Sequence, residues 1–289
     1  MTKNAIEIRG LEKRFPAFTL GPIDITVPQG AIYGLIGPNG AGKTTTIDVI
    51  FGMGAKRAGS ITVLGLDHIR DEVAMKQQVG YVSPDLNFTS WRTVGKTIEF
   101  VRSFYPAWDD EYCGRLLKTF HLDWNARIAT LSFGAPIKLA LLLALSWRPK
   151  VLILDEPTVG LDAIAKQQVF AELLAAVQDG DRTILISSHG LTDLERFADH
   201  IGMIKNGRML LEGPTSEVTE RYRMVDVVAD AAVDAAAFTS RPGFVVQQHA
   251  GNRWRVLVER EHAALPPGVT QIADSPVTLE ELFVALGRD

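Results

Sequence analysis

Short apolar runs without alternation mark the middle of the chain, at Val151–Leu154, Thr183–Ser187 and Ile201–Ile204. Strands that helices cover on both faces have this pattern, because neither face meets water. Between the first two runs, apolar residues recur over 163–179 at the spacing of one helix face, which is typical of a helix that packs on a sheet. Strand, helix and strand therefore predict a βαβ unit within a parallel sheet.

The pattern differs on either side of this region. Ile6–Ile8 and Ile23–Val27 alternate between apolar and polar residues, which predicts an antiparallel edge sheet. Asn206–Gly207 is a hairpin turn signal that leads into Met209–Leu211. Residues from about 85 to 150 have mostly helical spacing, so we expect them to form a separate helical lobe.

The tail differs from the rest of the chain in charge and composition. Residues 214–289 hold 11 of the 34 acidic residues but only 7 of the 30 basic ones, so the formal charge of −4 arises entirely there. We therefore expect one α/β domain over 1–213 and a small α+β accessory domain over 214–289, with a role in dimer contact or regulation. Three strands are predicted in the tail, Met224–Ala229, Phe244–Gln248 and Arg253–Val258.

Composition narrows the function classes. With 46% hydrophobic residues the chain can bury a large core, and the net charge of −4 argues against a charge-driven nucleic-acid binder. The first residues lack the apolar run of a signal peptide, so we expect a cytoplasmic protein. The most hydrophobic run, Ile137–Trp147, is interrupted by Lys138 and falls short of the roughly 20 residues that span a bilayer.

Residues 37–44 read Gly-Pro-Asn-Gly-Ala-Gly-Lys-Thr, the pattern of a phosphate-binding loop, and they follow an apolar run and precede a predicted helix. Glycines let backbone N–H groups converge on phosphate oxygens, and the helix adds its positive end. Lys43 is expected to reach the β and γ phosphates of ATP, and the Thr44 hydroxyl to bind Mg²⁺. The predicted nucleotide-binding residues here are Gly37, Asn39, Gly40, Ala41, Gly42, Lys43, Thr44 and Thr45.

Two acids, Asp155 and Glu156, follow the apolar run 151–154, and Pro157 stops the strand there. Both carboxylates should emerge at the carboxyl end of the sheet, where open α/β sheets bind ligands. Asp155 is predicted to hold Mg²⁺, since hard cations prefer oxygen ligands. Glu156 is the candidate general base for the attacking water.

These motifs together resemble the ATP-hydrolysing subunit of an ABC transporter over about residues 4–213. Val159–Asp162 is similar to the D-loop of that family, which implies a nucleotide-facing role for Asp162. Ser188-His189 resembles its switch histidine, so His189 is expected to hydrogen-bond the γ-phosphate and orient the water. Phe15 stands where such proteins carry an aromatic that stacks on adenine. The implied fold is a P-loop NTPase of ABC type with an antiparallel β subdomain and a helical lobe.

The signature loop of that family, usually Leu-Ser-Gly-Gly-Gln, is matched by residues 131–135, which read Leu-Ser-Phe-Gly-Ala. In the family this loop closes over the nucleotide of a second subunit, so two nucleotides are sandwiched in a dimer. Ser132 can donate its hydroxyl and Gly134 lets the backbone approach phosphate, but Phe133 and Ala135 depart from the pattern. We expect an active site of reduced efficiency.

A second departure lies at Pro84, where the family places a glutamine or glutamate that contacts Mg²⁺. Either Asp85 replaces it by a shift of one residue, or the metal relies on Thr44 and Asp155. The histidines His68, His121, His200, His249 and His262 show no metal-ligand spacing, and we interpret them as surface positions.

Aromatic residues gather before the apolar helix predicted from Pro136 to about Trp147. They either form the core of the lobe or line a groove for a short helix of a membrane subunit, as the resemblance implies. These residues are Trp91, Phe100, Phe104, Tyr105 and Trp108.

The resemblance is closest to bacterial ATPases of the ABC-2 exporter group, including those linked to bacitracin or acetoin. Segments 104–109, 193–199 and 276–283 are similar to theirs. It implies an ATPase that powers a probable exporter, peripheral on the inner face of the membrane through an integral-membrane permease, as a homodimer or with a second ABC ATPase. The alternatives are a catalytically weak regulatory half of a heterodimer and a soluble ABC ATPase without a membrane partner; no nucleic acid is expected.

Overall fold

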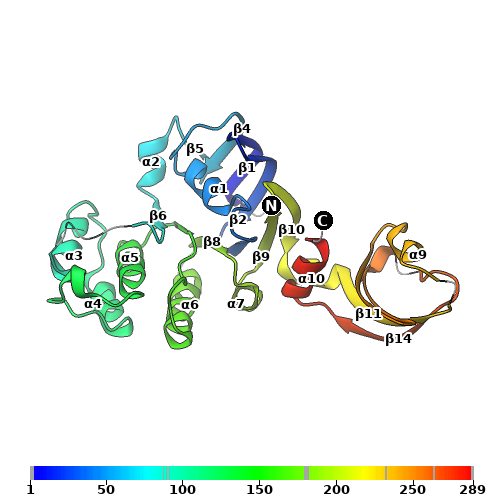
Figure 1. The fold of residues 1–289 in the computed structure, drawn as a ribbon. Coiled ribbons are helices and arrows are strands. Elements are labelled where there is room, and N and C mark those ends of the chain that lie inside the picture. The colour runs from blue at the N-terminus through cyan, green and yellow to red at the C-terminus, as the bar shows by residue number, and fades with distance from the viewer. Residues whose placement is uncertain are drawn as a thin grey trace.

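A computed structural model describes residues 3–86, 88, 90, 92–178, 182–231, 233–262 and 264–287. Trp91 of the aromatic set lies outside these residues. The described elements build three sheets with helices between and around them (Figure 1).

The central sheet has six strands in the order β10-β9-β3-β8-β7-β6. Five of them are parallel, and β10 pairs antiparallel with β9 through the turn at Asn206–Gly207. The three apolar runs lie in β7, β8 and β9, so the predicted parallel sheet is confirmed. The strands are β3 Ile32–Ile36, β6 Val79–Val82, β7 Val151–Leu154, β8 Thr183–Ser188, β9 His200–Lys205 and β10 Arg208–Pro214.

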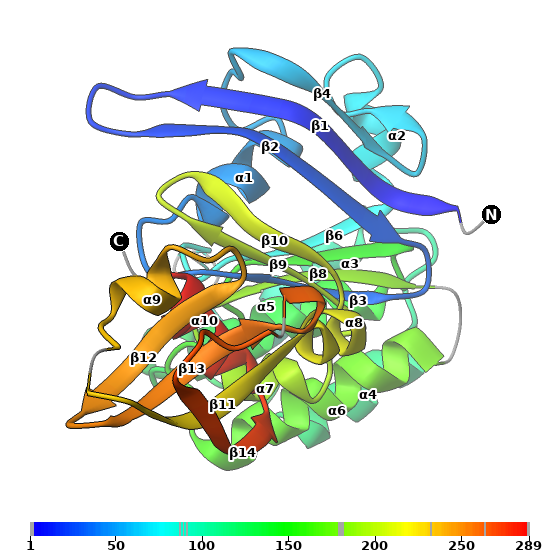
Figure 2. The same cartoon turned by 90° about the vertical axis from the view of Figure 1, so that its right-hand side faces the viewer.

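A four-stranded antiparallel sheet, ordered β2-β1-β4-β5, forms a second layer. The strand pair predicted from alternation is present, with Ile8 opposite Ile25. Helix α1 (Lys43–Ile50) lies between this sheet and the central sheet (Figure 2). The strands are β1 Asn4–Arg14, β2 Thr19–Pro28, β4 Ala58–Val63 and β5 Leu66–Asp67, and the short helix α2 spans Glu72–Lys76.

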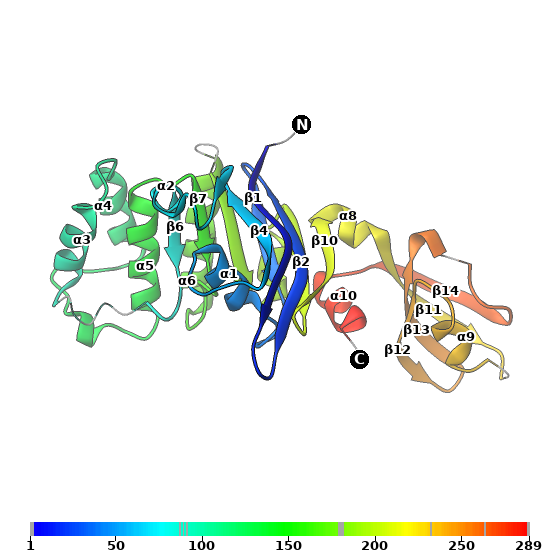
Figure 3. The ribbon, with the colours of Figure 1, turned by 90° about the horizontal axis from the view of Figure 1, so that it is seen from above.

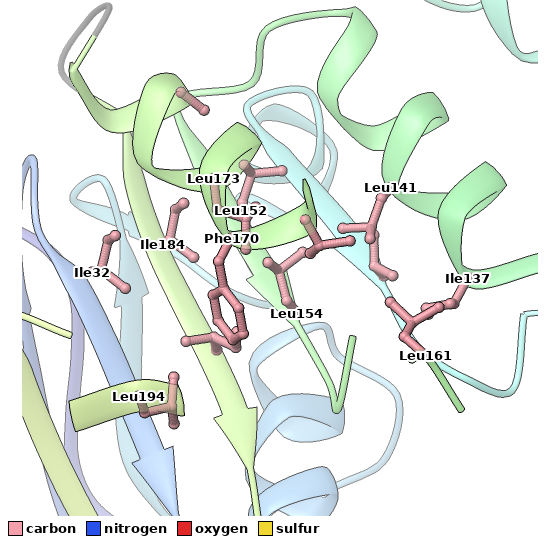
Figure 4. Packing of buried hydrophobic residues seen from close by; sticks show 14 of the residues in the cluster. Ile32, Ile137, Leu141, Leu152, Leu154, Leu161, Phe170, Leu173, Ile184 and Leu194 are labelled. Atoms are coloured by element: carbon pink, nitrogen blue, oxygen red, sulfur yellow. The ribbon is translucent and has the colours of Figure 1, made fainter. Parts of the chain in front are cut away.

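Neighbouring residues on the central strands belong to two different cores, because successive side chains point to opposite faces. Val151 and Ile153 pack with α1 and the antiparallel sheet. Leu152 and Leu154 pack with Phe170 on the opposite face, where α6 (Ala163–Gln178) covers the sheet (Figure 4). Burying each such side chain contributes about 1.5–3 kcal/mol, so both faces of the sheet are held firmly and its strand ends are fixed.

The helical lobe lies beside this core and consists of α3 (Val94–Arg102), α4 (Asp110–Thr119), the turn η1 (Ile128–Thr130) and α5 (Ala135–Ser146). Helix α5 is apolar nearly all round and buried, as its sequence predicts. Of the aromatic set, Phe100 and Phe104 are exposed and touch edge to face, whereas Tyr105 stacks on Trp147 with ring centroids 4.4 Å apart.

The tail forms a third sheet, ordered β12-β13-β11-β14, which projects from the rest of the molecule (Figure 3). It has its own small core around Phe238 and Trp254. The last helix, α10, leaves this sheet and packs into the large core of the α/β region through Leu279 and Leu282. The tail elements are α8 Thr215–Arg221, β11 Tyr222–Ala229, α9 Ala236–Thr239, β12 Phe244–Ala250, β13 Arg253–Glu259, η2 Arg260–His262, β14 Val269–Pro276 and α10 Leu279–Leu286.

One interpretation from the sequence is wrong. His68 is not a surface residue: it is 1% exposed, between the antiparallel sheet and α1. Burial lowers the pKa of its imidazole. The residues around His68 follow neither a strand nor a helix pattern, so the sequence did not predict its burial. Within the described residues, none of the helices combines the length and apolar character that crossing a bilayer requires.

Candidate nucleotide-binding site

The loop 37–42 connects β3 directly to α1, as its motif predicts. Gly42 stands immediately before the helix with φ 113°, a left-handed conformation that favours glycine. A Cβ on Gly37 would lie 2.3 Å from the carbonyl oxygen of Ile204 in the neighbouring strand. The glycines therefore allow the loop to curl tightly over the strand end, with the N-terminus of α1 facing the space above it.

Lys43 is 5% exposed and lies inside this curl. Its Nζ donates hydrogen bonds to the carbonyl oxygens of Gly37 at 2.7 Å and of Pro38 at 3.3 Å. The same ammonium forms an ion pair with Glu156 Oε1 at 3.1 Å. The loop itself thus holds the lysine at the helix N-terminus, where an anion would meet both its charge and the helix dipole.

Asp155 is 2% exposed and is bound by two hydroxyl groups. Thr44 Oγ1 donates to Asp155 Oδ2 at 2.8 Å, and Ser187 Oγ donates to Oδ1 at 2.5 Å. A buried carboxylate whose hydrogen-bond partners among the described side chains are neutral hydroxyls is well suited to a cation, and carboxylate and hydroxyl oxygens are hard donors. Thr44 and Asp155 therefore fit a divalent cation such as Mg²⁺.

A second acidic residue, Asp48, lies close to Thr44 and Asp155. Asp48 lies one helical turn beyond Thr44 on α1. Burial raises the pKa of the Asp48 carboxyl, and the charge of Asp155 raises it further. A bound cation would relieve this repulsion.

Glu156 has φ 45°, an uncommon backbone conformation for a residue with a side chain. Its backbone N–H donates to Ser187 Oγ at 2.9 Å, which holds the residue in this conformation. The side chain, 14% exposed, accepts a hydrogen bond from His189 Nδ1 through Oε2 at 2.8 Å. Strained backbone of this kind concentrates at functional sites, and here it aims the carboxylate at both Lys43 and His189.

A pocket of about 480 Å³ opens over the loop. Phe15, 40% exposed, lies at its edge, with Lys13 Nζ 5.2 Å from the ring centroid. Phe18 lies beside it, with ring centroids 6.2 Å apart. The pocket thus joins an aromatic end to a phosphate-binding end; it is lined by Phe15, Phe18, Pro38, Asn39, Gly40, Gly42, Lys43, Thr44, Thr45 and Glu156.

Four expected site residues lie elsewhere in the described part of the chain. Ser132 is exposed and Gly134 half-buried at the start of α5, and neither lines this pocket. Asp162 is exposed and accepts a hydrogen bond from the Ala165 N–H at 2.8 Å, as a cap of α6. Asp85 is exposed in the loop after β6, and the hydroxyl groups that bind Asp155 come from Thr44 and Ser187.

The structure also adds residues that sequence reasoning did not assign. Ser187 contacts both Asp155 and Glu156, and Phe18 shares the pocket with Phe15. A signal for Ser187 existed: it ends a predicted strand adjacent to the one that ends at Asp155. The register that pairs Leu154 with Ile186 is what brings the two strand ends together.

A strand, a glycine loop, a helix and a strand-end carboxylate pair define a P-loop nucleotide-binding protein. A family model described as ABC transporter matches residues 20–159. The chain is 32% identical to the Nod factor export ATP-binding protein I of Burkholderia orbicola (strain AU 1054) over 82% of this chain and 80% of that one. It belongs to the ATP-binding subunits of ABC transporters, a family of ATPases.

Two further similarities cover different extents of the chain. The ABC transporter ATP-binding protein YtrB of Bacillus subtilis (strain 168) is 28% identical over 97% of both chains, so the likeness includes the tail. A solved structure described as an ATP binding subunit of an ABC transporter superposes with a TM-score of 0.68 and 26% identity, over 75% of this chain and 92% of that one.

Proposed function

We propose that this chain binds Mg-ATP in the pocket over residues 37–45 and pairs with a second ATPase subunit, and that the pair powers export through a membrane permease. One observation carries the pairing. The pocket gathers the phosphate loop and Glu156, whereas the signature residues, exposed Ser132 and half-buried Gly134, lie outside it. This separation supports a pairing in which Ser132 and Gly134 of a second subunit would cover the nucleotide bound here.

Within the pocket, each end has its own task. Phe15 stacks on the adenine, and the N–H groups of 40–45 with Lys43 bind the phosphates. Thr44 and Asp155 would hold Mg²⁺, which neutralises charge on the β and γ phosphates. Asp85, one residue beyond the position matched by Pro84, would join them as a further oxygen ligand, although it does not line the pocket.

Hydrolysis needs a base beside the γ-phosphate. Glu156 accepts the proton of the attacking water at its carboxylate, once phosphate oxygens replace it as the partner of Lys43. His189 orients that carboxylate through the Nδ1 to Oε2 hydrogen bond of 2.8 Å, and it would donate from Nε2 toward the γ-phosphate when both ring nitrogens carry a proton. Ser132 and Gly134 of the second subunit complete the cover, with Asp162 at the junction of the two chains.

Two observations support export and a membrane partner: the names of relatives and a hollow in the helical lobe. Relatives include a Nod factor export ATP-binding protein and a probable multidrug ABC transporter ATP-binding protein from Escherichia coli (strain K12). The lobe has an apolar hollow of about 150 Å³ lined by residues including Phe88, Tyr105 and Trp147. A hollow of this size has room for one large apolar side chain, so it would receive a side chain from a short helix of an integral-membrane permease, which would hold the chain at the inner face of the membrane.

Light scattering of the purified chain tests the pairing. Glu156→Gln should run as a single chain without nucleotide and as a pair with ATP and Mg²⁺, because hydrolysis no longer dissolves the complex. Adding Lys43→Ala should remove the pair. A Glu156→Gln chain that binds ATP and stays single at every concentration would contradict the self-pairing.

Turnover separates this proposal from the regulatory half of a heterodimer. The wild-type chain alone should hydrolyse ATP with a rate that rises with the square of its concentration at low concentration. Nucleotide binding without any turnover would favour the regulatory reading instead.

A further inference from the structure

His189 is followed almost at once by the short helix α7 (Leu191–Glu195), which begins two residues later. Helix α7 has five residues, and its cap, Gly190, provides no side-chain hydrogen bond. A helix this short is not stable by itself in water. Its position, and with it the exit direction of the chain at His189, must be set by the elements that pack against it.

One of these elements is α6, the helix that covers one face of the central sheet. Lys166 Nζ and Asp193 Oδ2 form an ion pair at 3.5 Å between α6 and α7. Phe170 of α6 stacks on Phe197, just after α7, with ring centroids 4.6 Å apart and planes 7° from parallel. Leu194 of α7 is fully buried and lies below Phe170 (Figure 4).

The other element comes from the far end of the chain. Helix α10 lies beside α7, between the central sheet and the tail sheet (Figures 1 and 3). Leu279 and Leu282 of α10 are fully buried in the same core cluster as Leu194. The Leu279 backbone N–H donates to Glu195 Oε1 at 3.1 Å, which places the last carboxylate of α7 at the positive end of α10.

Helix α10 is firmly built and therefore able to hold α7. Thr278 and Glu281 form a capping box at its start, with both reciprocal hydrogen bonds present. At its other end, Lys205 of β9 contacts the carbonyl oxygen of Gly287. The tail helix is thus fixed to the central sheet at its end and to α7 at its start.

We infer that α10 positions His189 for hydrolysis by holding α7, with Glu195 and Leu282 as positioning residues that act through it. The inference rests on the role proposed above for His189. Loss of the α10 contact frees α7 to shift, and the His189 ring then loses its fixed place beside Glu156. Phosphate binding by 37–45 does not pass through α7, so ATP affinity should be untouched.

The first test is the steady-state kinetics of Leu282→Ala in the full chain. We expect kcat to fall about 5- to 30-fold with KM for ATP within about 2-fold, from a coupling of ordinary size. Val284→Ala is the matched control: Val284 is on the same helix, is 46% exposed, and faces a hollow next to Met224 and Arg255. It should leave both constants unchanged.

Glu195→Gln is the second variant, because Leu282→Ala removes a buried side chain and could destabilise the fold. It keeps the shape of Glu195 and removes the charge at the start of α10. We expect kcat to fall about 3-fold with unchanged KM, a modest share of the worth of a charged hydrogen bond. Unchanged kcat in a folded Leu282→Ala chain would overturn the inference. A rise in KM for ATP by the same factor as the fall in kcat would also overturn it.

A double-mutant cycle with His189→Ala separates positioning from general loosening. If α10 acts through His189, Leu282→Ala should change the residual single-turnover rate of His189→Ala by less than about 2-fold. The same fold-loss in both backgrounds would show a merely structural role and overturn the inference. Full turnover in His189→Ala alone would instead overturn the role proposed for His189 in hydrolysis, and the inference with it.

Discussion

The two halves of the proposed nucleotide clamp are built in opposite ways. In the phosphate-binding half, Lys43, Asp155 and Glu156 are buried or nearly so and are linked to one another through Thr44 and Ser187. In the signature half, Ser132 is exposed and the Phe133 ring is 86% exposed.

The signature half has one clear support, the D-loop of its own chain. A Cβ on Gly160 would lie 2.4 Å from the Phe133 ring, so the ring rests on that glycine. Under the pairing proposed above, one chain would preorganise its phosphate-binding half and would leave its signature half to act on the nucleotide of a second subunit. The substitutions below test that division.

The largest effect is expected from Lys43→Ala. It removes a buried ammonium from the phosphate-binding half and leaves the Glu156 carboxylate without its ion pair. We expect ATP affinity to fall by at least about 10³-fold, beyond what a single charged hydrogen bond supplies. Isothermal titration with ATP and Mg²⁺ measures it, and ordinary affinity in this variant would refute the phosphate-binding role of the loop.

Glu156→Gln should separate binding from chemistry within the same half. The amide keeps the shape of the side chain but cannot accept the proton of the water. We expect hydrolysis to fall by about 10²–10⁴-fold, the usual worth of a general base, with ATP affinity retained. Phosphate release gives the rate and nucleotide titration the affinity; an unchanged rate would remove Glu156 from this role.

Ser132→Ala should affect only the signature half. The Ser132 side chain is exposed on its own chain, so neither folding nor ATP binding by the single chain should change. We expect hydrolysis to fall by about 10- to 100-fold from one lost hydrogen bond to a developing charge. A loss of ATP affinity in the single chain would mean that the two halves are not separate.

Phe133→Ala tests the apolar side chain of the signature half. Because the ring is 86% exposed, the free energy of unfolding should change by less than about 0.5 kcal/mol. By contrast, Phe170→Ala in the large core should lower the free energy of unfolding by about 3–5 kcal/mol. Chemical denaturation measures both. Phe133→Ala should also weaken nucleotide-dependent pairing of two chains. Stronger pairing in this variant would show that the Phe133 ring hinders the approach of the second chain.

The smallest effect concerns acid stability of the lobe that carries the signature half. Asp109 caps α4 and pairs with Arg148 at 2.7 Å. The Tyr112 N–H and then Arg148 lower the pKa of its carboxyl. Its stabilisation is therefore complete above the unfolded pKa of about 3.9 and is lost as the pH falls through the lower folded value.

Asp109→Asn removes this titration and keeps a capping side chain. We expect a loss of at most about 1 kcal/mol at pH 7, as for a partly exposed ion pair, and a difference from the wild type that shrinks in acid. Urea denaturation at pH 3 and pH 7 measures it. A difference that grows in acid would contradict the assignment, and ATP affinity should stay unchanged throughout.

Much of the ATP-binding half could be predicted from short stretches of sequence. A strand, residues 37–44 and a helix are contiguous, so local sterics and hydrogen bonding decide their shape. The end of β7 at Asp155 and Glu156 is equally local, since Pro157 cannot continue a strand. His68 shows the limit: a single polar residue has no period, so its burial was not predicted.

What the sequence by itself determined is the set of local elements and the types of chemistry at their ends. What only the tertiary structure decided is which ends meet. Thr44 and Asp155 are 111 residues apart, and they touch because β3, β8 and β7 are neighbours in register. Helix α10 reaches α7 from 84 residues away. Such pairings are chosen by burial summed over the whole core, and no short stretch of the chain contains that sum.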